Sequence, residues 1–158
     1  MEFTINRDVF LKSLSYAYGV IERKNTLPIL SNVLIEAKNS KIKITATDLD
    51  LIYSEEIPIE NLINEGTTTT SANILYDILR KIESGAKVEL SLQSTNKLKL
   101  VSGKSKFNLL CISSDTFPLS DEDIKQKNFE VSSQELLKLL NKTKISISND
   151  ETRHYLNG

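Results

Sequence analysis

Three kinds of side chain in this sequence could take part in catalysis or metal binding: a pair of carboxylates, one thiol and one imidazole. Asp48 and Asp50 are two residues apart, so on a strand their carboxylates would share a face and could hold a hard cation such as Mg²⁺ or Mn²⁺. No motif places a third ligand, and a turn or an exposed strand is the alternative interpretation. Cys111 and His154 are the single Cys and the single His, and neither has a base, an orienting partner or further ligands at a suitable spacing. The sequence therefore predicts no enzyme, no metal site and no cofactor.

Basic side chains offer a different chemistry, the binding of phosphate groups. The chain is nearly neutral overall, with Lys+Arg 20 against Asp+Glu 21 and a pI of about 5.9, so contact with nucleic acid requires a local patch. Two predicted helices provide such patches, and a solvated helix face is the alternative interpretation. The residues are Arg7, Lys12, Arg23 and Lys24 on or just after the first helix, and Arg80 and Lys81 on the second.

A third basic group lies near the end of the first domain. Between Glu89 and Asp115 there is no acidic residue, but there are four lysines at 97, 99, 104 and 106. On the predicted strand 104–110, alternation places Lys104 and Lys106 on one face and Phe107 and Leu109 on the other. An unpaired edge strand carries charge either as a guard against aggregation or because a partner pairs with it, and the sequence leaves both interpretations open.

These residues need a framework, and the hydrophobic periodicity predicts two similar halves. The first half reads as a strand at 2–6, a helix from Arg7 to Ile21 with Asn6 as N-cap, and strands near 33–38, 41–47 and 49–59. The second half reads as a strand at 66–71, a helix at 72–83, and strands near 88–93, 97–101 and 104–110. Each half is strand, helix, then three antiparallel strands, which predicts one α+β domain over residues 1–112.

Two local patterns carry burial predictions. Val9 is assigned to the buried face of the first helix together with Phe10, Leu14, Ala17 and Ile21. The apolar stretch 25–32 follows that helix, and Pro28 prevents the helix from continuing through it. We expect an extended connection here, with Leu27, Ile29 and Leu30 all buried.

A second domain is predicted beyond the first. Residues 113–127 read as a linker with Pro118 and an acidic run. Residues 129–140 then line up with residues 3–14, with identical Phe, Leu, Lys and Leu at matching positions. We therefore expect the second domain to start at about residue 128, with a strand and a helix, and to be cut short at Gly158.

The remaining composition indicates a cytoplasmic protein. A single Cys excludes an internal disulfide, which suits a reducing compartment. We expect neither a signal peptide nor a membrane span, because no basic start precedes an apolar core and no apolar run is long enough.

Five short segments follow one another along the chain: TLPILSN at 26–32, TDLD at 47–50, GKSKF at 103–107, FP at 117–118 and RHYLNG at 153–158. In this order they resemble the bacterial sliding clamp family, the beta subunit of DNA polymerase III, and the resemblance covers the whole chain. It implies the DNA-clamp fold, in which helices face a central hole and antiparallel sheets lie outside. It further implies a non-catalytic processivity factor of DNA replication, near the nucleoid, that closes as a head-to-tail homodimer around duplex DNA. DNA polymerase and the clamp loader are the other implied partners, with no membrane involved.

The resemblance also implies site residues. Lys24 matches a basic DNA-contacting position, and His154 with Tyr155 matches a DNA-facing pair; Arg23 and Arg80 are expected to add to this surface. Asn73 and Asp150 fall at contact positions too, but the one is uncharged and the other negative, so both contacts are weakened.

Two protein contacts are implied as well. The dimer interface is expected at Lys104, Lys106, Phe107 and Leu109, with Phe107 as its anchor. Arg153 and Leu156 match the rim of the cleft that binds partner peptides. Two alternatives remain: a truncated stand-alone protein-interaction domain without DNA function, and a metal-dependent hydrolase that uses Asp48 and Asp50.

Overall fold

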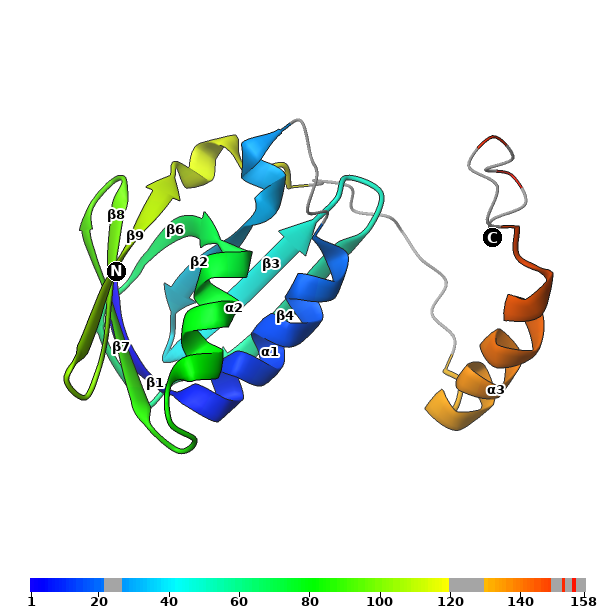
Figure 1. Cartoon of the computed structure of the whole chain (residues 1–158), viewed down its shortest axis with the longest axis horizontal. Helices are drawn as coiled ribbons and strands as arrows, with labels where there is room; N and C mark the ends of the chain where they lie inside the picture. Colours follow the sequence, from blue (N-terminus) through cyan, green and yellow to red (C-terminus); the bar gives the residue numbers. More distant parts are fainter. Residues whose placement is uncertain (22–26, 120–129, 149–151, 153–154, 156–158) are drawn as a thin grey trace. The chain divides into compact units, whose positions relative to one another are not determined.

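The structure is a computed structural model that describes residues 1–21, 27–119, 130–148, 152 and 155 of the 158-residue chain. Two compact units follow one another along the chain, residues 1–120 and residues 121–158 (Figure 1). The predicted boundaries of domain, linker and second domain remain predictions. Six of the predicted contact residues lie outside the described residues: Arg23, Lys24, Asp150, Arg153, His154 and Leu156.

The elements of the first unit follow the order that the sequence predicts for two similar halves. The first half contains β1 (Glu2–Asn6), α1 (Arg7–Val20), β2 (Asn32–Lys38), β3 (Lys41–Thr47) and β4 (Ile52–Pro58). The second half contains β6 (Gly66–Ser71), α2 (Ala72–Lys81), β7 (Lys87–Ser94), β8 (Lys97–Ser102) and β9 (Ser105–Ile112). The prediction missed three short elements: strand β5 (Asn61–Asn64) and the 3-10 helices η1 (Pro28–Ser31) and η2 (Ser114–Thr116).

The first strand of each half pairs with the strands of the other half. β1 is antiparallel to β7, with Asn6 opposite Lys87, and β6 is antiparallel to β2, with Gly66 opposite Ala37. The sheet has nine strands in the order β4-β3-β2-β6-β9-β8-β7-β1-β5. Neither half completes its part of the sheet alone, so the two halves form one α+β unit.

The helices α1 and α2 lie side by side on one face of this sheet (Figure 1). The Asn6 side chain caps α1 by accepting the Asp8 N–H at 2.9 Å, and the Ser71 hydroxyl accepts the Ile74 N–H at 3.4 Å at the start of α2. Burial of each large apolar side chain between helices and sheet stabilises the fold by about 1.5–3 kcal/mol. The helix residues with no exposed surface are Phe10, Leu14, Ala17, Ala72, Leu75 and Leu79.

Two predicted burial patterns are wrong. Val9 is 40% exposed, because neighbouring helix residues point about 100° apart and Phe10 takes the direction toward the sheet. The stretch 25–32 was expected to be extended with three buried side chains, but residues 28–31 form η1, which the Leu30 N–H joins to the Leu27 carbonyl. This turn directs Leu30 into the core and leaves Leu27 49% exposed.

The second unit contains α3 (Ser133–Thr143), followed by the 3-10 helix η3 (Lys144–Ser146). The helix predicted from the repeat is confirmed, whereas residues 130–132, where the predicted strand should continue, are not in a strand. Four leucines of α3, at 136, 137, 139 and 140, are between 45% and 59% exposed. In the described part of the chain, no helix is both long and apolar enough to cross a membrane.

Gly66 allows the N-terminus to pack closely against β6. Its φ is +153°, and a Cβ at this position would lie 3.1 Å from both the Cβ and the backbone nitrogen of Met1. We expect Gly66→Ala to lower the free energy of unfolding by about 1–3 kcal/mol, because it adds backbone strain and displaces Met1. Denaturant titration measures the change. Gly19→Ala is the control: a Cβ at that helical position would have no atom within 4 Å apart from its chain neighbours and the local helix backbone, and we expect a gain of about 0.5–1 kcal/mol. Equal stability of the Gly66→Ala variant and the unchanged protein would contradict this account.

Candidate nucleic-acid and assembly interface

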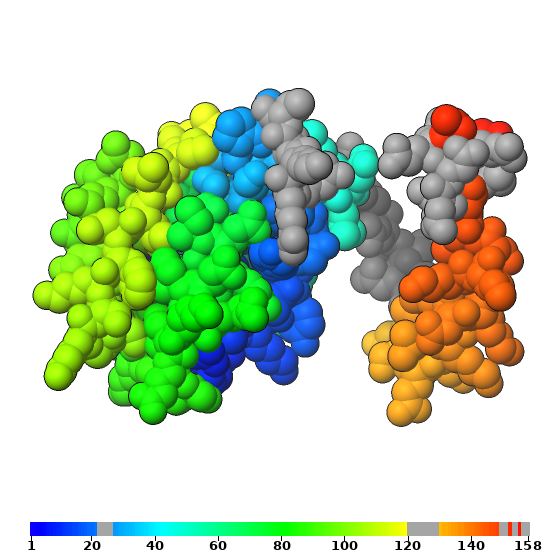
Figure 2. Space-filling view, viewed as in Figure 1, coloured from blue at the N-terminus to red at the C-terminus, as the bar shows by residue number. Residues whose placement is uncertain are grey.

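The outward surface of α1 and α2 carries the cations that could meet phosphate groups; Figure 2 shows this side of the first unit, with α1 in blue and α2 in green. Arg80 is 60% exposed, and its guanidinium lies 4.0 Å from the Asp77 carboxylate and 5.6 Å from the centre of the Tyr76 ring. Arg80 is therefore accessible, but Asp77 partly offsets its charge. The exposed positions are Val9, Lys12, Tyr16 and Gly19 on α1, and Ile74, Asp77, Arg80 and Lys81 on α2.

Arg7 does not belong to this surface, contrary to the expectation that it contacts phosphates. Only 13% of its side chain is exposed. Its Nε donates to the Leu79 carbonyl at 2.7 Å and its Nη2 to the Arg80 carbonyl at 3.2 Å. These carbonyls belong to the last turn of α2, where no intrahelical donors are left and the helix dipole favours a cation. Arg7 therefore links the start of α1 to the end of α2.

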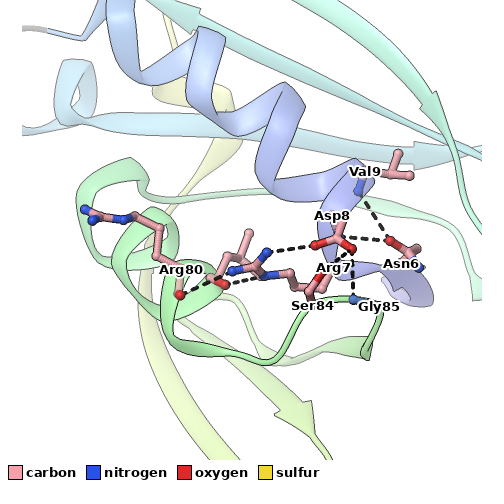
Figure 3. Close-up of polar contacts among 8 residues, drawn as sticks. Asn6, Arg7, Asp8, Val9, Arg80, Ser84 and Gly85 are labelled. Atoms are coloured by element: carbon pink, nitrogen blue, oxygen red, sulfur yellow. Dashed lines mark hydrogen bonds and ion pairs between the residues drawn. The ribbon is translucent and has the colours of Figure 1, made fainter.

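Asp8 completes this link from the first turn of α1. One of its oxygens accepts Arg7 Nη1 at 2.7 Å, while the other accepts the Ser84 hydroxyl at 2.9 Å and the Gly85 N–H at 2.8 Å (Figure 3). The hydrogen bond from Arg7 is the largest cause that lowers the pKa of Asp8 below its ordinary value, followed by those from Ser84 and Gly85. The carboxylate of Asp8 is thus neutralised locally and holds the turn after α2.

Four tyrosines form two ring pairs at the helix layer. Tyr16 lies against Tyr53 of β4, with ring centres 6.4 Å apart, and Tyr18 stacks on Tyr76 at 4.8 Å. The Tyr53 hydroxyl donates to the Glu55 carboxylate at 2.5 Å. Burial, together with this carboxylate, raises the pKa of Tyr53 from its ordinary value of 10.0 to about 12.

Three of the predicted DNA contacts fall on described residues. Asn73 and Arg80 lie at opposite ends of α2, and Tyr155 lies in the second unit with 70% of its surface exposed. The Asn73 side chain is half-buried, and its Oδ1 is buried with no hydrogen-bond partner among the described residues. As a DNA contact, Asn73 remains a prediction.

β9 offers an open edge, as the sequence suggests. It pairs with β8 from Ser105 to Leu110, but with β6 only at Cys111 and Ile112. In the described structure, the other side of residues 105–109 has no strand partner. The backbone groups along this edge can therefore pair with an added strand.

A groove lies beside this edge. It has a volume of about 510 Å³ and an apolar floor formed by Ile74, Ile78 and Phe107. Asp77, Arg80 and Lys81 complete its lining, so the charge at its rim is predominantly positive. The groove suits an apolar side chain that carries carboxylates beside it.

The structure separates the four predicted interface residues. Phe107 is half-buried at the groove, and Lys106 is exposed on the opposite face of β9. Lys104 lies in the turn before β9 and is exposed. Leu109 is only 4% exposed, because alternation along β9 directs it into the core of its own unit. Leu109 is thus corrected from a contact residue to a core residue.

Asp48 and Asp50 do not share a strand face. They lie in the turn before β4, where Asp48 Oδ1 accepts the N–H groups of Asp50 at 3.0 Å and Leu51 at 2.7 Å. β4 therefore starts at Ile52 rather than near residue 49, and the turn interpretation is the one that the structure supports. The described residues contain no group of three His, Cys, Asp or Glu that could hold a metal ion. Cys111 is 8% exposed, and burial raises the pKa of its thiol.

Sequence reasoning missed the role of Arg7 and Asp8, and it missed the groove. The sequence contained a signal for the role of Arg7. An arginine directly after a helix N-cap lies close to the C-terminal end of an antiparallel neighbouring helix. The groove had no such signal, because Ile74, Ile78 and Phe107 come from two elements whose proximity depends on the strand pairing.

The comparisons with known proteins agree on one family. The family described as DNA polymerase III beta subunit, N-terminal domain, matches residues 1–121. The beta sliding clamp of Caulobacter vibrioides (strain NA1000 / CB15N) is 39% identical over 159 residues, and that of Pseudomonas aeruginosa is 32% identical over 158 residues. Both alignments cover 100% of this chain, but only 42% and 43% of the relatives. The chain thus spans about two fifths of the length of the curated relatives that it matches.

Solved structures give the same result. The sliding clamp (DNA polymerase III subunit beta) from Bartonella birtlesii, bound to griselimycin, is 42% identical and superposes with a TM-score of 0.95 over 100% of this chain and 42% of its own. Caulobacter crescentus pol III beta is 39% identical, with a TM-score of 0.94 over 100% of this chain and 42% of its own. The expected α+β clamp fold is confirmed.

The link between Arg7 and α2 predicts a large effect on stability. We expect Arg7→Met to lower the free energy of unfolding by about 2–4 kcal/mol, because it leaves the Leu79 and Arg80 carbonyls without their side-chain donor and removes the charged donor to the Asp8 carboxylate. Lys12→Met, which removes an exposed cation from the same helix, should change it by less than about 0.5 kcal/mol. Urea titrations of both variants test this, and equal effects would show that Arg7 is an ordinary surface residue.

The lowered pKa of Asp8 predicts a pH dependence. A carboxyl whose pKa is lower in the folded protein stabilises the fold above its ordinary pKa of 3.8, and this contribution is lost as the pH falls through the folded-state pKa. We expect Asp8→Asn to be less stable than the unchanged protein at pH 7, with the difference shrinking from about pH 4 downward. Urea titrations at a series of pH values measure it. A difference that stays constant down to the lowest pH would argue against the assignment.

Proposed function

Since this chain belongs to the DNA polymerase III beta subunit family of sliding clamps, which are non-catalytic, we propose that it forms part of a ring around duplex DNA. Such a ring holds a DNA polymerase on its template mechanically, so its contacts with DNA can be weak and independent of sequence. The proposed place of action is the chromosome in the cytoplasm.

The open edge of β9 beside the apolar groove is the observation that carries this proposal, because a ring requires the unit to join another at an edge. We propose that this edge pairs with a later domain of a second copy, so that two copies close head to tail. Phe107 would anchor the contact, while Lys104 and Lys106 would meet carboxylates of the partner. The partner's carboxylates would also be complementary in charge to Arg80 and Lys81 at the rim of the groove.

The helix layer is the proposed DNA surface. Arg80 and Lys12 are accessible on it, and Arg23 and Lys24 follow α1 in the sequence. We propose that these cations contact phosphates without reading bases. The further residues of this surface are His154, Tyr155 and, as weaker contacts, Asn73 and Asp150.

Polymerase and clamp-loader binding are proposed at a second surface. Arg153 and Leu156 would form part of the rim of a peptide-binding cleft. The relatives are more than twice as long as this chain, and the rest of the cleft would come from sequence that corresponds to their remaining length.

The interface assignment predicts the effect of one substitution. In the complete protein, we expect Phe107→Ala to raise the dissociation constant of self-association at least tenfold, because it removes the aromatic side chain from the floor of the groove. Sedimentation equilibrium measures the constant. Ile63→Ala is the control, since Ile63 is 56% exposed on β5 at the far end of the strand order. An unchanged constant for Phe107→Ala would count against ring closure through this edge.

A further inference from the structure

Tyrosines are concentrated at the helix layer of this protein. The chain has five, and four of them form the pairs Tyr16–Tyr53 and Tyr18–Tyr76 on or beside α1 and α2. Of these four, Tyr16 is the one that is exposed, at 52%, whereas the other three are half-buried. A large aromatic side chain at this exposure contributes little to the core, so its position calls for a different role.

The local structure fixes how Tyr16 is presented. It lies one helical turn after Lys12 on the exposed side of α1, so the two side chains are neighbours. Its ring rests on Tyr53 at a tilt of 49°, and the hydroxyl of Tyr53 is anchored to Glu55. Among the described residues, the Tyr16 hydroxyl has no hydrogen-bond partner. The ring of Tyr16 is thus supported by Tyr53, and its hydroxyl is available as a hydrogen-bond donor to a ligand that binds at the exposed side of α1.

The charges around Tyr16 determine what kind of ligand its hydroxyl can bind. Arg7 is hydrogen-bonded to the last turn of α2, and the carboxylate of Asp77 partly offsets the positive charge of Arg80. Glu55, which accepts the hydrogen bond of Tyr53 behind Tyr16, carries a negative charge that Lys12 interacts with electrostatically. Lys81 remains an exposed cation on α2, whereas beside Tyr16 the charge of Lys12 is opposed by Glu55. A neutral hydrogen-bond donor at this place can bind a phosphate without adding a charged, salt-dependent contact.

We propose that the Tyr16 hydroxyl donates a hydrogen bond to a backbone phosphate of duplex DNA, as an uncharged contact beside the cationic ones. The inference rests on the proposed function, in which the helix layer faces DNA. Hydroxyl contacts to phosphate carry no sequence information, and so they suit a surface that slides. The hydroxyl contact would add to the affinity for DNA without making log K depend more steeply on log salt.

The dependence of affinity on salt separates this contact from a charged one. We would measure binding of the full chain to a fluorescein-labelled mixed-sequence DNA duplex by anisotropy, between about 20 and 200 mM NaCl. Tyr16→Phe removes only the hydroxyl, and we expect it to weaken binding about three- to tenfold at every salt concentration, with an unchanged slope of log K against log salt. Lys12→Ala removes a charge, and we expect its slope to be shallower by about 0.9.

Thr67→Val is the matched control. It removes an exposed hydroxyl from β6, where Thr67 pairs with Glu36 away from the helix layer, and should leave binding unchanged. If Tyr16→Phe binds like Thr67→Val while Lys12→Ala binds more weakly, the tyrosine contact is overturned and the clamp function stands. A changed slope for Tyr16→Phe would also overturn it, because the residue would then act through Lys12. If the unsubstituted chain does not bind the duplex even at the lowest salt, the inference fails together with the proposed DNA surface.

Discussion

The exchange of first strands between the two halves is the constraint on which the rest of the structure depends. β1 completes the strands of the second half and β6 completes those of the first. Each helix starts at the residue that follows its exchanged strand: α1 at Arg7 directly after β1, and α2 at Ala72 directly after β6. With no loop in between, the strand pairing itself decides where the helices begin, and it brings both onto the same face of one sheet.

The helix pair in turn decides which charges remain available. Because the start of α1 meets the end of α2, Arg7 satisfies carbonyls that the last turn of α2 cannot satisfy itself. The negative charge of Asp8 is neutralised at the same contact between α1 and α2, by Arg7 and by the N–H of Gly85. The outward surface is left with Lys12, Lys81, a partly offset Arg80 and the exposed ring of Tyr16, a composition that favours weak contacts over tight binding. Such weak contacts are what a topologically closed ring needs, since the ring and not the affinity would keep it on DNA.

The sheet is continuous but nearly divided between β6 and β9. Only two residue pairs join these strands, and the hydroxyls of Thr69 and Thr70 donate to the carbonyls of Ile112 at 2.7 Å and Leu110 at 3.1 Å. Buried threonine hydroxyls thus close the junction where the backbone ladder ends. Beyond it, β9 diverges from β6, and its free edge and the adjoining groove become the proposed site of assembly. The same strand therefore belongs both to the core, through Leu109 and Cys111, and to the surface, through Phe107.

The sequence by itself determined the main helices and strands of the first unit and the family of this protein, but not strand β5 or the 3-10 helices. Alternation, helical periodicity and the cap at Asn6 are local signals, and they suffice for two halves of strand, helix and three strands. They do not suffice for contacts between residues distant in sequence. Sequence reasoning assigned Arg7 to the surface and Leu109 to an interface, because the carbonyls that bind the first and the core that buries the second lie elsewhere in the chain. Only the tertiary structure, through the pairing of β1 with β7 and of β6 with β2, decided which side chains remain free to act.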